Sequence, residues 1–213
     1  MSILVVMEQP GGMSLETLAA GQQLAKELGT SVSAALLGDA VSAPSAELEK
    51  VYTVEHPLLK DYTPDGYTIA LRQLIEKVQP EYVLLPHTYQ VRDFLPKLAT
   101  ALGKVAVSDV VSHRIEGGKL VLVRQLFQGK VNADVRFTSD APHFASLQAG
   151  AWRADQLVAG SPEVEKFTPT LAAGDIRTMP EPRFRESARA VDLGAAELIV
   201  AVGRGIKEAE NIP

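Results

Sequence analysis

Two glycine-containing turns carry residue types that can bind phosphate. The first, Gln9–Gly12, follows an apolar run and precedes a helical pattern. Pro10, Gly11 and Gly12 would then lie between the carboxyl end of a strand and a helix N-terminus, where open α/β sheets bind ligands and backbone N–H groups attract anions. The turn lacks both the G-x-G-x-x-G spacing and the Lys-Ser/Thr pair of a Walker sequence. It could be a nucleotide-binding loop or an ordinary tight turn.

The second turn, Gly203-Arg204-Gly205, follows another apolar run near the end of the sequence. It adds a guanidinium group, which can bind a phosphate through two parallel hydrogen bonds. A G-x-G triplet by itself is common, so a surface arginine between two turn glycines explains the pattern equally well.

No complete set of catalytic residues is evident. No G-x-S-x-G nucleophile elbow occurs, and the four histidines lack both i, i+4 spacing and clustered carboxylates. These histidines are His56, His87, His113 and His143. His87 could face a pocket at a strand end, or could be a hydrogen-bonded structural residue. We therefore expect no catalytic residue, no metal site and no stand-alone enzyme.

The composition narrows the class of protein. Of 213 residues, 46% are hydrophobic and 22% charged, which is typical of a globular chain with a packed core. The absence of cysteine excludes disulfides, thiolate-bound zinc and cysteine-held iron–sulfur clusters, so redox chemistry would need a cofactor. A net charge of −5 argues against a nucleic-acid partner. Without a signal-peptide pattern or a long apolar stretch, we expect a cytoplasmic protein and no membrane insertion.

Hydrophobic periodicity predicts the elements that position the two turns. The first hundred residues alternate short apolar runs with helical patterns, as in a parallel sheet covered by helices. Beyond Val105 the period changes to two, and Gly117-Gly118 suits a hairpin connection. We expect strands near 3–7, 31–37, 51–54, 82–85, 112–116, 119–127, 131–138 and 143–148, and helices near 14–28, 67–78 and 92–102. The predicted fold is a three-layer α/β/α domain over residues 1–159, with a mostly parallel sheet and an antiparallel edge.

The remainder of the chain has a different pattern. Residues 160–190 contain four prolines and few periodic apolar positions, which predicts a linker or an extended crossing segment. Residues 195–202 form a continuous apolar run that predicts a buried strand. With the 203–205 turn, residues 191–213 are expected to begin a truncated second α/β domain.

Several segments together resemble the alpha subunits of electron transfer flavoproteins. Arg92–Ala99 with Val107–Val110 is similar to that family's "G-K-N-L-L-P-R-V-A … I-S-D-V", and Arg124–Gly129 to "R-P-I-Y-A-G-N-A". Val200–Asn211 resembles "V-V-S-G-G-R-G-L-K-S-x-E-N-F", and Ile3–Glu8 resembles the family's first strand and acidic residue. Lys130 replaces the Asn of "A-G-N".

The resemblance implies a function and partners. The N-terminal domain would be a Rossmann-like scaffold related to the adenine nucleotide alpha hydrolase fold. In the family AMP binds the beta subunit, so the Pro10–Gly12 loop would be vestigial. FAD would be held mainly by a C-terminal domain and the beta subunit, with Gly203, Arg204 and Gly205 near it. Electrons would pass from flavin dehydrogenases, such as those of fatty acid β-oxidation, to a downstream acceptor.

Two other functions remain open on the residues alone. A small adenine-nucleotide-binding module would use the Gln9–Gly12 loop without electron transfer. An interaction module would only provide a surface for a heterodimer.

Overall fold

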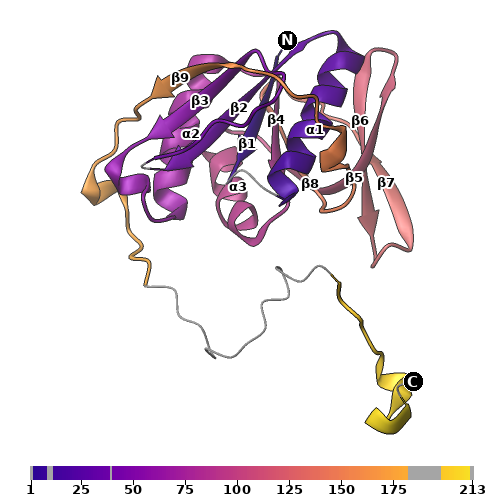
Figure 1. The fold of residues 1–213 in the computed structure, drawn as a ribbon. Helices are drawn as coiled ribbons and strands as arrows, with labels where there is room; N and C mark the ends of the chain where they lie inside the picture. The colour runs from indigo at the N-terminus through magenta and orange to yellow at the C-terminus, as the bar shows by residue number, and fades with distance from the viewer. Residues whose placement is uncertain (1, 9–11, 39, 182–197, 212–213) are drawn as a thin grey trace. The chain divides into compact units, whose positions relative to one another are not determined.

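The chain divides into two compact units, Met1–Pro180 and Glu181–Pro213. Paired strands organise the first, whereas the described part of the second contains only two short 3-10 helices. The computed structural model describes residues 2–8, 12–38, 40–181 and 198–211. Figure 1 shows both units.

One sheet runs through the first unit in the order β7-β6-β5-β8-β4-β1-β2-β3-β9. Its strands are β1 Ser2–Met7, β2 Ser31–Gly38, β3 Lys50–Glu55, β4 Tyr82–Pro86, β5 Ala106–Glu116, β6 Lys119–Leu126, β7 Val131–Val135, β8 His143–Leu147 and β9 Glu163–Phe167. Only the β5–β6 and β6–β7 pairs are antiparallel. The predicted mostly parallel sheet with an antiparallel edge is confirmed.

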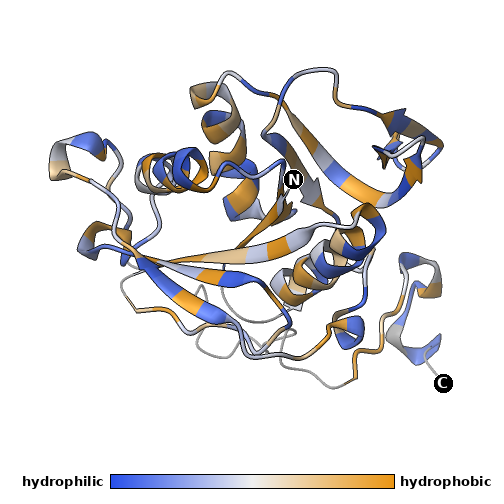
Figure 2. Cartoon of the chain, turned by 90° about the horizontal axis from the view of Figure 1, so that it is seen from above, coloured by the Kyte–Doolittle hydropathy of each residue, from blue (hydrophilic) through white to orange (hydrophobic). Residues whose placement is uncertain are grey.

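Helices cover both faces of the sheet, which confirms the three layers (Figure 2). The α-helices are α1 Gly12–Leu28, α2 Pro64–Val78 and α3 Tyr89–Ala101, and the 3-10 helices are η1 Pro57–Leu59, η2 Ala154–Gln156, η3 Ala173–Asp175, η5 Arg204–Ile206 and η6 Ala209–Asn211. Alternate side chains of β1 point to opposite layers, as the strand period of two requires. Val5 joins the core on the α1 side, whereas Leu4 and Val6 join the core formed with α2 and α3.

Threonine caps fix where two of the helices begin. Thr63 precedes α2 and its hydroxyl accepts a hydrogen bond from the Gly66 N–H, while Thr88 precedes α3 and accepts from the Val91 N–H at 3.1 Å. Both caps satisfy amide groups that have no partner within the helix. The first helix begins at Gly12, two residues before the predicted start, so Ser14 lies inside α1, and its hydroxyl accepts a hydrogen bond from the Glu8 N–H at 3.2 Å.

The position of strand β8 in the sheet could not be inferred from the elements next to it in sequence. It follows the antiparallel β5–β7 ribbon in the chain, yet it lies between β4 and β5 and is parallel to both. Local periodicity identifies a strand but not its partners, because both faces of a central strand are buried whatever the order.

The proline-containing segment after residue 159 is attached to the first unit. β9 pairs in parallel with β3, where the Lys50 amine lies 2.7 Å from the Glu165 carboxylate. Further along, the Gln73 amide bonds both the N–H and the carbonyl of Thr170. The crossing segment thus contains an edge strand of the sheet.

The predicted buried strand at 195–202 is wrong for the part that the structure describes. Residues 198–202 form no strand, and Leu198 and Val200 are 81% and 80% exposed. Residues 195–197 lie outside the described residues. An apolar run becomes a strand only where other strands accept its backbone hydrogen bonds, and none of the described strands pairs with it.

Candidate functional site

The Gly203–Gly205 turn leads into the short 3-10 helix η5, Arg204–Ile206, and all three predicted residues are exposed. Gly203 precedes it with an ordinary negative φ of −77°, and its carbonyl accepts from the Ile206 N–H at 3.2 Å. The exposed Arg204 guanidinium could contact a phosphate or a flavin ring. Residues 198–211 do not enclose a dinucleotide, so no chemical step through FAD follows from them.

The first predicted turn is described only at its end. Pro10 and Gly11 lie outside the described residues, whereas Gly12 begins α1 with a φ of +45°, a conformation that favours glycine. This turn follows β1, whose neighbours β2 and β4 are reached in opposite directions across the sheet. The predicted loop is therefore at a topological switch point, where open α/β sheets bind ligands.

A carboxylate of the chain itself follows β1 at this switch point. Glu8 follows β1, and its Oε1 accepts a hydrogen bond from the Thr88 hydroxyl at the N-terminus of α3. Burial raises the pKa of the Glu8 carboxyl, although hydrogen bonds from Thr88 and the Val91 backbone act in the opposite direction. An internal anion is thus held where the positive end of α3 would attract an external one.

His87 lies in a polar cluster after β4. Its Nδ1 is 2.9 Å from the Ser146 hydroxyl and its Nε2 is 3.8 Å from the Asp109 carboxylate. Burial lowers the pKa of His87, and Arg92 and Arg124 add to the effect, whereas Asp109 opposes it. A neutral imidazole is therefore favoured near pH 7.

This Ser–His–Asp cluster is not arranged as a hydrolytic triad. Ser146 is fully buried, and its oxygen also accepts the Asp109 N–H at 3.3 Å. A nucleophile must reach its substrate. The buried Ser146 hydroxyl cannot do so, because it already contacts the His87 ring and the Asp109 N–H. The cluster instead connects β4, β8 and the irregular part of β5.

The remaining histidines lie at separate places. His56 Nδ1 accepts from the Leu58 N–H, His113 Nε2 is 2.8 Å from Glu27, and His143 stacks on Phe137. Within residues 2–8, 12–38, 40–181 and 198–211, no group of three or more histidines and carboxylates could hold a metal ion. Nor does any helix in these ranges have the length and apolar character needed to cross a membrane.

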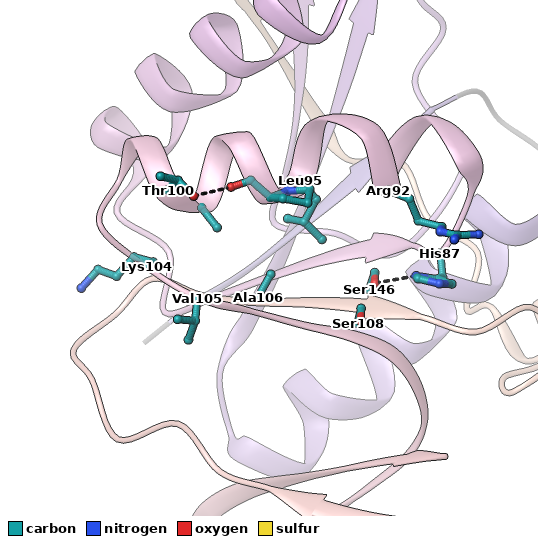
Figure 3. A pocket seen from close by; sticks show the side chains of 11 residues that line it. His87, Arg92, Leu95, Thr100, Lys104, Val105, Ala106, Ser108 and Ser146 are labelled. Atoms are coloured by element: carbon teal, nitrogen blue, oxygen red, sulfur yellow. Dashed lines mark hydrogen bonds between the residues drawn. The ribbon is translucent and has the colours of Figure 1, made fainter. Parts of the chain in front are cut away.

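A groove beside His87 was missed by the sequence reasoning. It has a volume of about 480 Å³ and lies between α3 and the start of β5 (Figure 3). We call it the α3–β5 groove; its lining is His87, Arg92, Leu95, Pro96, Ala99, Thr100, Lys104, Val105, Ala106, Ser108 and Ser146. The sequence offered no direct signal for it, because the lining combines residues of α3 with residues of β5 and β8.

Comparison with known proteins assigns the family. The sequence profile of the electron transfer flavoprotein domain matches residues 3–172, nearly all of the first compact unit. The electron transfer flavoprotein alpha subunit of Bacillus subtilis (strain 168) is 33% identical over 205 residues, covering 93% of this chain and 62% of that protein. The alpha subunit of Thermoanaerobacterium thermosaccharolyticum is 31% identical over 96% of this chain and 65% of its own length.

A third relative has a different activity in its name. The LctC subunit of the lactate dehydrogenase (NAD(+),ferredoxin) of Acetobacterium woodii is 27% identical over 92% of this chain and 48% of its own length. The chain thus spans less than two thirds of the length of these relatives. By its profile match, the chain belongs to the electron transfer flavoprotein family.

Proposed function

We propose that this chain is the N-terminal portion of an electron transfer flavoprotein alpha subunit, working in a heterodimer with a beta subunit. The profile match over residues 3–172 is the observation that carries this proposal. FAD would carry electrons from flavin dehydrogenases to a downstream acceptor, in the cytoplasm. It would be held mainly by a C-terminal domain and the partner subunit, and residues 191–213 would begin that domain.

The first compact unit would serve as a scaffold rather than as a catalyst. The flavin supplies the redox chemistry when bound, so the chain need provide only position and charge. The fully buried Ser146 agrees with this division of roles, because a buried hydroxyl cannot reach a substrate. Gly203, Arg204 and Gly205 would lie near FAD, with the exposed Arg204 side chain contributing positive charge.

Co-expression with a beta-type subunit tests the proposal. We expect gel filtration to show a complex of the two subunits. When the full-length alpha subunit is used, we expect this complex to show the visible absorbance of oxidised flavin. Arg204→Ala should lower flavin content or change its reduction potential, whereas the matched exposed cation variant Lys207→Ala should not. Absence of a complex with the full-length chain contradicts the proposal.

The Pro10–Gly12 loop is proposed to be a vestigial nucleotide loop. The Glu8 carboxylate beside α3 supports this, because a phosphate placed there would meet a negative charge that Thr88 already binds. Isothermal titration of the chain with AMP and with ATP should therefore show no tight binding. Stoichiometric binding of either nucleotide would favour the alternative, an adenine-nucleotide-binding module without electron transfer.

A further inference from the structure

The two edges of the sheet are protected to different degrees. β9 carries three charged side chains, Glu163, Glu165 and Lys166, which form ion pairs with residues of β3 and α2. β7 lies at the other edge (Figure 1), and its one charged residue, Asp134, is paired with Arg114 of β5. Charged side chains on an edge strand oppose the addition of a further strand, and β7 has little of this protection.

The outer edge of β7 is open among the described elements. β7 pairs only with β6, and it is the first strand in the order of the sheet. Val131 is 50% exposed, and Asn132 and Asp134 are exposed as well. Half of the backbone N–H and C=O groups of an edge strand point away from its neighbour, so a further strand can bind them.

Lys130 makes this edge complementary to itself. A twofold axis between two antiparallel copies of one strand must pass between identical residues, because residues directly opposite each other point to the same face of the sheet. With the axis at Asn132, Lys130 of each copy lies opposite Asp134 of the other, and Val131 lies opposite Ala133. Cross-strand pairs of opposite charge and of apolar residues stabilise a sheet.

The other registers are less favourable. An axis at Ala133 would place Lys130 opposite Arg136, and an axis at Asp134 would place two carboxylates opposite each other. An axis at either end of β7 would depend on residues outside the strand for two of every five pairs. The Lys130 amine forms no ion pair with any residue that the structure describes, so it is available to Asp134 of a second copy.

We propose that β7 is the interface of a symmetric homodimer, in which two copies of this chain join their sheets edge to edge across an axis at Asn132. Main-chain hydrogen bonds between the two edge strands hold the copies together, and the two Lys130–Asp134 pairs set the register. Because β7 has only five residues, the interface is small, and we expect a reversible dimer with a dissociation constant on the order of 100 µM. The proposal goes beyond the proposed function and does not depend on flavin binding.

Disulfide cross-linking locates the interface, because the chain has no cysteine of its own. Asn132→Cys places two thiols opposite each other at the axis, within the distance that a disulfide spans. Val164→Cys is the control, because Val164 is 52% exposed on β9 at the other edge. Mild oxidation should convert Asn132→Cys to a covalent dimer at least about tenfold faster than Val164→Cys. Equal rates overturn the proposal, and faster cross-linking by Ala133→Cys than by Asn132→Cys overturns the register.

Sedimentation velocity of the unmodified chain tests the association itself. The average mass should rise between about 10 µM and about 1 mM chain and should fall with added salt. Lys130→Glu, which places a carboxylate opposite Asp134, should weaken association at least about tenfold. Lys119→Glu is the control, because it makes the same change of charge on β6, away from the edge. Circular dichroism confirms that each variant is folded. A monomer at every concentration, or an equal loss in Lys119→Glu, overturns the proposal.

Discussion

Two apolar runs of similar composition have opposite environments in this chain. Residues 3–7 form β1 and are at most 3% exposed, whereas Leu198, Ile199, Val200 and Val202 are 49–81% exposed and form no strand. β1 has β2 on one side and β4 on the other, with helices on both faces. The difference shows that an apolar sequence specifies a strand only in combination with the strands and helices that cover it.

Matched leucine truncations in the two runs should give the largest difference. Leu4→Ala removes a fully buried side chain and should lower the free energy of unfolding by about 2–5 kcal/mol, through lost burial and a cavity. Leu198→Ala removes an 81% exposed side chain and should change it by less than about 0.5 kcal/mol. Urea unfolding followed by circular dichroism measures both. A large cost at Leu198 would mean that this run is packed in solution.

Asp65 at the start of α2 binds the backbone of Arg177, near the end of the first unit. Its side chain is 6% exposed, its Oδ2 accepts the Arg177 N–H at 2.9 Å, and it also pairs with the Lys97 amine. Asp65→Asn should cost about 1–3 kcal/mol, because a buried set of charge-assisted hydrogen bonds is weakened. We expect faster tryptic cleavage at Arg177 as well.

The pH dependence of stability gives an independent check on Asp65. The Lys97 amine and the Arg177 backbone lower the pKa of this carboxyl in the folded chain. Its contribution is therefore present above the unfolded value near 3.8 and is lost as pH falls through the lower folded pKa. Asp65→Asn should flatten this acid limb. Asp175→Asn is the control, because among the described contacts that exposed carboxylate accepts a hydrogen bond only from the nearby Ala172 N–H. If both variants flatten the acid limb equally, the role of Asp65 is contradicted.

Close packing against β1 should give the next largest effect. A Cβ added at Gly21 in α1 would lie 2.6 Å from Val5 Cγ2, and valine has little rotamer freedom with which to move away. Gly21→Ala should therefore be destabilising by about 1 kcal/mol, despite the better helix propensity of alanine. Gly203 follows the apolar run at 198–202. A Cβ added there would meet nothing within 4 Å, and the φ of Gly203 suits alanine, so Gly203→Ala should leave the stability unchanged. Thermal melts distinguish the two, and a stabilised Gly21→Ala would show that α1 can move from β1.

Local sequence patterns predicted the strands and helices of the first half of the chain, but not the order of all strands in the sheet. The strands β1 to β4 and the helices between them follow from apolar period and from breakers such as Gly29 and Pro80, within a few residues of the observed bounds. The position of β8 between β4 and β5, and the pairing of β9 with β3, could not be predicted. Both depend on contacts between segments far apart in sequence, which a periodicity does not encode.

The candidate site was predictable to a smaller extent. The place of Gly12 between a strand and a helix followed from the apolar run before it, and His87 was expected at a strand end, whereas the switch point depends on a strand order that the sequence did not indicate. The Glu8–Thr88 bond and the α3–β5 groove were missed, because each joins residues from different elements. Arg204 is exposed, as a side chain between two turn glycines is expected to be.

Glu8, at the end of the buried run, should give the smallest effect, a change in pH dependence. Burial raises its folded pKa above the ordinary 4.5, so the folded chain binds more protons than the unfolded chain between the two values. The wild-type chain should lose stability as pH rises through that window, and Glu8→Gln should not. Urea midpoints from about pH 4 to about pH 7 measure the difference. Identical curves would contradict a raised pKa of the Glu8 carboxyl in the folded chain.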